Sequence, residues 1–173
     1  MNTNIKHYVS SFENLYEGEP WFGRSMTSIL EEVSPSKAYK KATKEQHSIY
    51  EILQHVLAWR ELFVKRLNGD TSTSIQMNSE LDWPALPTSQ TAENWKKLLA
   101  RLSENQQELV KALKQKKDSV LAEEFANSKA TLETHLEGNL QHDKIILVVP
   151  INMKSLHRHG QIWLTIQTSV YKF

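Results

Sequence analysis

The 173-residue sequence contains no cysteine, and this absence removes several kinds of site at once. Without cysteine there are no disulfide bonds, no thiolate ligands for a metal ion and no cysteine nucleophile. Any metal site in this protein must therefore use other ligands, and any nucleophilic chemistry must use another side chain.

The sequence also lacks a large excess of positive or negative charge, and it lacks long apolar runs. The 21 basic and 20 acidic side chains give a net charge of +1, so there is no electrostatic footprint for nucleic acid or an anionic membrane. No uninterrupted apolar run approaches the ~20 residues of a membrane span, and the N-terminus shows no signal-peptide core. We expect a soluble, cytoplasmic protein without nucleic-acid or membrane partners.

Glycine and proline are scarce as well, at five residues each, and they separate long stretches of helical spacing. Apolar residues at intervals of three and four predict four long helices, and helical spacing also continues through residues 21–33 until Ser34 and Pro35 end it. Ser48 and Glu51 form a capping box at the start of the second long helix. The long helices are expected at about residues 4–17, 48–67, 95–113 and 128–144.

The remaining segments are less regular. Residues 70–88 form a polar connection that contains Pro84, Pro87 and a lone aromatic residue, Trp83. After residue 144, the β-branched run Ile145 to Val149 suits either a short strand or the last turn of a helix, and residues 155–170 suit a further helix. Four long helices without a hairpin signal predict an all-α protein: a four-helix bundle with an irregular C-terminal segment, in a single domain over residues 1–173.

The most informative residue is His55, because it lies where an amphipathic helix should bury hydrocarbon. Ile52, Trp59 and Leu62 share its helical stripe. A buried imidazole needs hydrogen-bond partners or a metal ion, since a bare polar group there costs a few kcal/mol. Two interpretations follow for His55: a metal ligand, or an ordinary core histidine bonded to a carbonyl or carboxylate oxygen.

Several short motifs between Pro20 and Trp95 agree in order and spacing with one known family. They are Pro20-Trp21-Phe22-Gly23-Arg24-Ser25-Met26, Leu30-Glu31-Glu32-Val33-Ser34, Ala38, His47-Ser48-Ile49, Glu51, His55, Ala58-Trp59-Arg60, Leu67-Asn68-Gly69, Asp82-Trp83-Pro84 and Trp95. With these motifs the chain resembles the DinB/YfiT-like superfamily over roughly residues 20–145. The resemblance implies an up-down four-helix bundle, commonly dimeric, so we expect a homodimer with a two-fold interface.

Members of this family often hold a divalent metal ion on three histidines, one from the second helix and two from a His-x-x-x-His pair on the last helix. Carried over by position, His55 matches the second-helix ligand and His142 matches the first histidine of the pair. Position 146 should then hold the third ligand, but this sequence has Ile146 there.

A family-like ending appears later, as Leu156-His157-Arg158-His159-Gly160-Gln161-Ile162. Histidines at i and i+4 lie on one helix face and can converge on one ion, whereas more distant residues converge only if the fold brings them together. We choose His157 as the third ligand, because it holds the family ligand's place before Arg-Gly-Gln. His159 and His135 are the alternatives, and so is an incomplete site.

Three neutral imidazoles leave open positions on an ion for water or substrate, as in catalytic sites. A nitrogen-only set suits zinc, nickel, iron or copper, and such an ion can acidify water for hydrolysis or activate a thiolate for group transfer. Characterised members of the resembled family include transferases that act with low-molecular-weight thiols, and hydrolase activity is often proposed. Asp143 and Glu51 are candidates for orienting an imidazole, although both also suit a helix surface, and the capping box already explains Glu51.

The leading hypothesis is therefore a DinB-like protein with a divalent zinc, nickel or iron ion on His55, His142 and His157. It would act on a small molecule as a metal-dependent thiol S-transferase or hydrolase. The alternative is a metal-free DinB-like binding or dimerisation module whose site was lost with position 146.

Overall fold

The computed structural model describes residues 4–21, 23–41 and 43–152, with side chains through Lys144. These residues form six α-helices and one short 3-10 helix, η1, and contain no β-strand. The helices are α1 (Ile5–Glu17), α2 (Met26–Leu30), α3 (Pro35–Ala38), α4 (Ile49–Leu67), α5 (Ala92–Lys114), η1 (Asp118–Ala122) and α6 (Leu132–Asn152). The all-helical class predicted from the sequence is therefore confirmed.

Side-chain caps fix where the long helices begin. The Ser48 hydroxyl accepts from the backbone N–H of Glu51, and the Glu51 carboxylate accepts from the backbone N–H of Ser48 at 2.8 Å. This is the capping box predicted for the second long helix, and it satisfies donors that the first helical turn leaves unpaired. Thr91 caps α5 in a similar way, through the backbone N–H of Asn94.

The first short helices differ from the prediction. Helical spacing through residues 21–33 becomes only the five-residue helix α2, which ends at Leu30, so Ser34 and Pro35 do not end this helix but start the next one. Pro35 is also the first residue of α3, because a proline needs no N–H donor at that position and its fixed φ suits a helix start.

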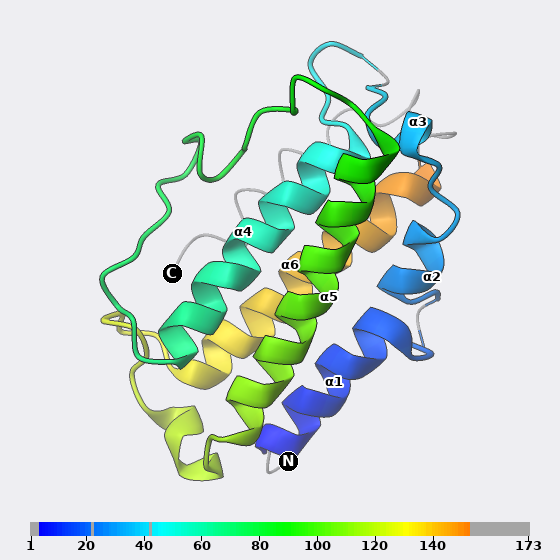
Figure 1. The fold of residues 1–173 in the computed structure, drawn as a ribbon. Coiled ribbons are helices and arrows are strands. Elements are labelled where there is room, and N and C mark those ends of the chain that lie inside the picture. Colours follow the sequence, from blue (N-terminus) through cyan, green and yellow to red (C-terminus); the bar gives the residue numbers. More distant parts are fainter. Residues whose placement is uncertain (1–3, 22, 42, 153–173) are drawn as a thin grey trace.

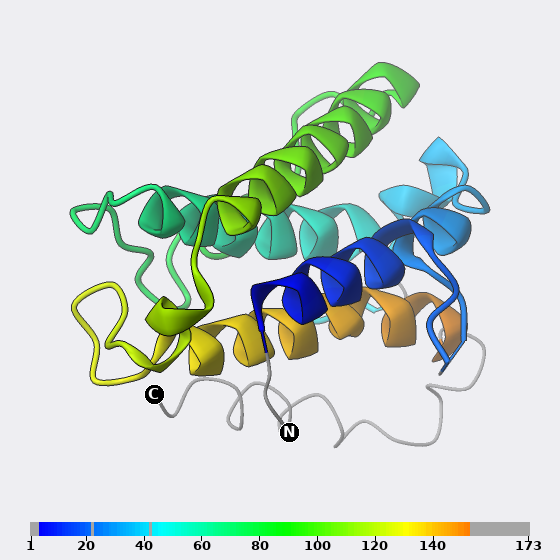
Figure 2. The same cartoon turned by 90° about the horizontal axis from the view of Figure 1, so that it is seen from below.

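Four long helices pack side by side, as Figures 1 and 2 show. Helix α4 packs against α5 and α6, and α1 packs against the same two helices. The short helix α3 packs against α4 and α5, while α2 packs against α1 and α6. No helix in the described part of the chain combines the length and apolarity needed to cross a membrane.

The up-down order implied by the resemblance is not confirmed, because α4 and α5 run in the same direction. Leu53 near the start of α4 shares an apolar cluster with Leu98 near the start of α5, and Leu67 and Leu113 near their ends share a second cluster. The connection of residues 68–91 returns along the length of α4 (Figure 1), which is roughly 28 Å for its 19 residues. A loop of this length allows a parallel neighbour, whereas a tight turn would force an antiparallel one.

The last helix is longer than predicted. Helix α6 continues to Asn152, so residues 145–149 are helical and the strand alternative for Ile145 to Val149 is wrong. The β-branched run there favours a strand only weakly, since tertiary context often overrides such preferences. The helix expected at residues 155–170 lies outside the described residues.

The buried core agrees with the helical periodicity. Eight of the ten residues predicted to build it are buried, whereas Leu99 and Trp59 are half-buried. The buried eight are Ile52, Leu53, Val56, Trp95, Leu98, Leu102, Leu109 and Leu132.

We expect the Leu102→Ala substitution to lower the free energy of unfolding by about 2–5 kcal/mol. The Leu102 side chain is 1% exposed, so its loss removes buried hydrocarbon and leaves a cavity that its neighbours fill only in part. Chemical denaturation measures the change. Leu81→Ala is the matched control, because Leu81 is 65% exposed and its truncation should change stability by less than about 0.5 kcal/mol. Equal effects of the two substitutions would contradict the core assignment.

Candidate metal centre

The fold brings His55 of α4 and His142 of α6 together in the interior. Their Nε2 atoms lie 3.1 Å apart, and the two side chains belong to residues that are 5% and 4% exposed. Because 87 residues separate them in the sequence, this proximity comes from the packing of α4 against α6. Two of the three predicted metal ligands are thus placed next to each other.

Asp82, from the connection between α4 and α5, contacts Nδ1, the ring nitrogen of His55 that does not face His142. The Nδ1 atom of His55 lies 2.8 Å from the main-chain oxygen of Asp82 and 2.9 Å from its Oδ1. Both oxygens are acceptors, so Nδ1 carries the proton and Nε2 presents its lone pair toward His142. A fixed tautomer with a bare Nε2 is the form that binds a metal ion.

The Asp82 carboxylate is itself held in place by two donors. The indole Nε1 of Trp59 donates to its Oδ1 at 2.7 Å, and the backbone N–H of Asn78 donates to its Oδ2 at 2.7 Å. These bonds satisfy a carboxylate that is only 4% exposed. The carboxylate that orients His55 therefore has little freedom to turn away.

Trp83 covers one face of the His55 ring. The indole stacks on the imidazole at a centroid distance of 4.0 Å with an interplanar angle of 7°, and His47 stacks on the same indole at 3.8 Å and 12°. The indole lies between the two imidazoles, because one ring cannot carry both of them on a single face at these distances. The wall it forms keeps solvent from the His55 ring.

Burial keeps both central imidazoles neutral near pH 7. Desolvation lowers the pKa of His55, although the nearby Asp82 acts against this change. Desolvation also lowers the pKa of His142, to about 3, with smaller contributions from His55 and the Arg60 guanidinium. A neutral imidazole has the lone pair that metal coordination requires.

Next to His142, a buried polar cluster ties three helices together. The Nε of Arg60 in α4 donates to the Asn105 side-chain oxygen at 2.9 Å, and its two terminal nitrogens donate to Gln106 of α5 and Asp143 of α6. Arg60 is 2% exposed and Asp143 is fully buried. Desolvation raises the pKa of the Asp143 carboxyl, and the adjacent guanidinium opposes that rise.

The two carboxylates suggested as imidazole orienters have other partners. Asp143 pairs with Arg60, and Glu51 forms the capping box and an ion pair with Lys41 at 2.7 Å. Glu51 approaches only the outer histidine, His47, at 3.9 Å. The interpretation of Glu51 as a helix cap is confirmed. The residue that contacts the His55 ring is Asp82, which the sequence indicated only as part of a family motif and not as a partner of His55.

A cavity of about 330 Å³ opens beside His142, between α4, α6 and the connection that follows α4. His135 also lines it, and its Nε2 lies 3.0 Å from the Ser128 hydroxyl. Desolvation lowers the pKa of His135, with a smaller contribution from Arg66. This cavity gives a small molecule a place next to the histidine pair.

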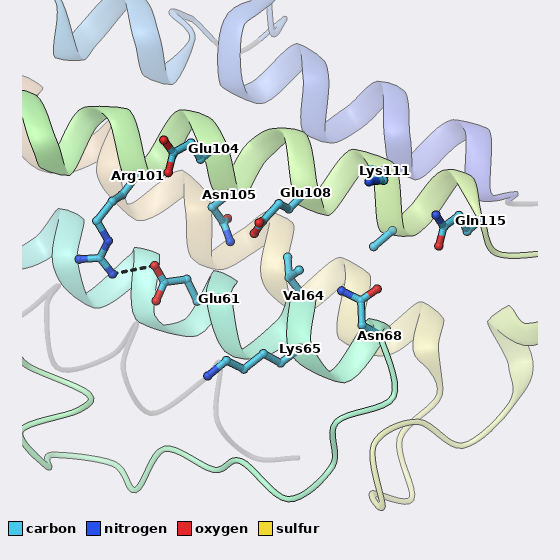
Figure 3. Close-up of a pocket in the computed structure, with 11 residues that line it drawn as sticks. Glu61, Val64, Lys65, Asn68, Arg101, Glu104, Asn105, Glu108, Lys111 and Gln115 are labelled. Carbon is cyan, nitrogen blue, oxygen red and sulfur yellow. Dashed lines mark hydrogen bonds and ion pairs between the residues drawn. The ribbon is translucent and has the colours of Figure 1, made fainter.

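A larger groove of about 630 Å³ lies between α4 and α5 and contains neither His55 nor His142 (Figure 3). Three acidic and three basic side chains line it, and the pair Arg101–Glu61, at 2.7 Å, crosses from one helix to the other. Its charges balance, and it lacks the histidines. The smaller cavity, which His142 lines, is therefore the candidate functional site.

The third predicted ligand, His157, lies outside the described residues, as does His159. The backbone of Ile146 continues α6, but its side chain also lies outside the description. Among the residues whose side chains are described, no three histidine, aspartate or glutamate side chains are grouped so as to hold a metal ion. A three-histidine site that used His55 and His142 would therefore need its third ligand from outside these residues.

Comparison with known proteins identifies a family. A family model described as the DinB superfamily matches residues 22–145, which is more than half of the chain and includes both His55 and His142. Ile146 and His157 lie beyond the matched residues. No curated protein and no solved structure matches the chain.

Proposed function

The chain belongs to the DinB superfamily, and on this premise we propose that it binds a divalent metal ion through His55, His142 and His157. The protein would then act on a small molecule as a metal-dependent thiol S-transferase or hydrolase. The observation that carries the proposal is the buried pair of Nε2 atoms, 3.1 Å apart, with the opposite nitrogen of His55 fixed by Asp82.

The two imidazoles fit a metal ion in separation and in chemistry. Two nitrogens at about 2.0–2.1 Å from one tetrahedral zinc ion lie about 3.3–3.4 Å apart, within a few tenths of the separation between the His55 and His142 nitrogens. Both rings are neutral near pH 7 because burial lowers their pKa values. Nickel and iron also suit a nitrogen set of this kind.

The roles proposed for the metal ion, Asp82, Trp83 and the cavity do not depend on which substrate is bound. A divalent ion would supply a Lewis acid that acidifies water or a thiol. Asp82 fixes the tautomer and the orientation of His55, and Trp83 keeps water from its ring. The cavity beside His142 gives the substrate access to the centre.

The test is the metal content of protein purified without an affinity tag and dialysed against zinc, nickel or iron. We expect about one ion per chain, and we expect His157→Ala to lose most of it. His159→Ala is the matched control, because it removes an imidazole two residues away and should leave the metal content unchanged. A metal content near zero in the unmutated protein would overturn the proposal. Loss on His159→Ala instead of His157→Ala would reassign the third ligand.

The second candidate function is a metal-free module that binds a small molecule or a second copy of the chain. Two observations favour it: Ile146 occupies the family's third-ligand position, and the two imidazoles can satisfy each other. The bare Nε2 of His55 can accept a hydrogen bond from the N–H at Nε2 of His142 without any ion. The same metal analysis separates the two candidates. The expected homodimer stays a prediction.

A further inference from the structure

The cavity beside His142 carries a fixed charge of one sign. Arg66, in the last turn of α4, is the one lysine or arginine that lines it, and no aspartate or glutamate does so among the described residues. A binding site with one positive charge and no negative charge selects for an anion, because opposite charges attract strongly where water is partly excluded.

The walls of this cavity are mostly apolar. Trp59, Leu62 and Phe63 line it from α4, and Ile75 and Met77 line it from the connection that follows. The volume of about 330 Å³ lies at the small end of the usual range for ligand pockets. Apolar walls with one charged group are typical of sites that bury the body of a ligand and fix one end of it.

From these observations we propose that the cavity binds a small monoanion with an apolar or aromatic body, whose anionic group pairs with Arg66. Charge-assisted hydrogen bonds from a guanidinium to a carboxylate can be bidentate, which fixes the ligand's orientation. The apolar body then lies against Phe63 and the other apolar residues that line the cavity.

The inference deepens the proposed function in one respect. If His142 holds a metal ion, a molecule in this cavity lies next to that ion, and the small monoanion is then the substrate class. Binding to Arg66 does not itself require the ion. The two proposals can therefore be tested separately.

Arg66 also has a purely structural interpretation, because a cation in the last turn favours the negative end of a helix dipole. Among the described residues, no aspartate or glutamate lines the cavity together with Arg66. A structural role would affect every ligand of the cavity equally. A binding role affects anions only.

The experiment uses the 173-residue protein dialysed against a chelator, so that the proposed metal centre does not contribute. The probes are benzoate and its neutral isostere benzamide, and binding is followed by the indole N–H resonance of Trp59 in two-dimensional nuclear magnetic resonance spectra. That resonance is assigned with Trp59→Phe. We expect benzoate to bind at least about ten times more tightly than benzamide, because the guanidinium pairs with its carboxylate.

Arg66→Gln should lower the affinity for benzoate about tenfold and leave the affinity for benzamide unchanged. The unchanged benzamide affinity shows at the same time that the cavity stays folded. Lys65→Gln is the matched control, because this substitution also removes one positive charge from the last turn of α4. Lys65 lines the groove between α4 and α5 and not the cavity beside His142. The substitution should leave both affinities unchanged.

Equal affinities for benzoate and benzamide, or an Arg66→Gln protein that binds benzoate as tightly as the unmutated protein, would overturn the inference. Failure of benzoate to bind overturns it as well and leaves the metal-centre proposal standing. A protein that binds benzoate through Arg66 but takes up no metal supports the binding inference and overturns the metal centre.

Discussion

Replacing His55 by alanine is expected to abolish stoichiometric metal binding while leaving the helical content largely intact. The substitution removes the Nε2 atom that faces His142 and also the ring that Asp82 and Trp83 hold in place. The bundle should survive, because its two apolar clusters are built from other residues. Metal analysis and far-ultraviolet circular dichroism of the same sample measure both parts of the result.

His135→Ala is the matched control for this prediction. His135 lines the same cavity as His142, but its Nε2 is engaged by the Ser128 hydroxyl at 3.0 Å. Its loss should therefore leave the metal content unchanged. If His135→Ala removes the metal and His55→Ala does not, the centre has been assigned to the wrong histidine.

The second large effect concerns stability. Asp143→Asn should lower the free energy of unfolding by about 3–5 kcal/mol, because it leaves the Arg60 cation buried without its counter-charge. Arg60 is 2% exposed and Asp143 is fully buried, so water cannot replace the lost partner. Urea denaturation, with the metal content held constant, measures the change.

Two comparisons make this result specific. Glu93→Gln breaks the exposed pair with Lys97, whose side chains are 74% and 67% exposed, and should leave the denaturation midpoint unchanged. The double variant Arg60→Met with Asp143→Leu should recover part of the loss, because replacing both charges with apolar groups removes the unpaired cation. A single Asp143→Asn variant as stable as the unmutated protein would mean that Asp143 does not neutralise Arg60.

The regular part of the fold could be predicted because it depends on local patterns. The capping box at Ser48, the end of α4 before Asn68–Gly69 and the periodicity of α5 all follow from residues within a few positions of one another. The direction of α5 could not be predicted, since it depends on the path of residues 68–91, which form no regular element. The position where α6 ends was not predicted either. A β-branched run such as residues 145–149 does not show which residues pack around it, and that packing decides between helix and strand.

The candidate site divides in the same way. The pairing of His55 with His142 was expected from the resemblance, and the structure places them together. Asp82 was part of the resemblance, but nothing local indicated that it would reach a histidine 27 residues away. Arg60 was missed as a buried residue because arginine is mostly found on surfaces, and only its partners in α5 and α6 make its burial tolerable.

One irregular segment contributes residues both to the surroundings of His55 and to the cavity beside His142. The connection between α4 and α5 supplies Asp82, which orients His55, and also Ile75 and Met77, which line the cavity. The backbone N–H of Asn78, the residue after Met77, donates to the Asp82 carboxylate. Substitutions at Ile75 or Met77 that change which ligand the cavity accepts are therefore expected to disturb the orientation of His55 as well.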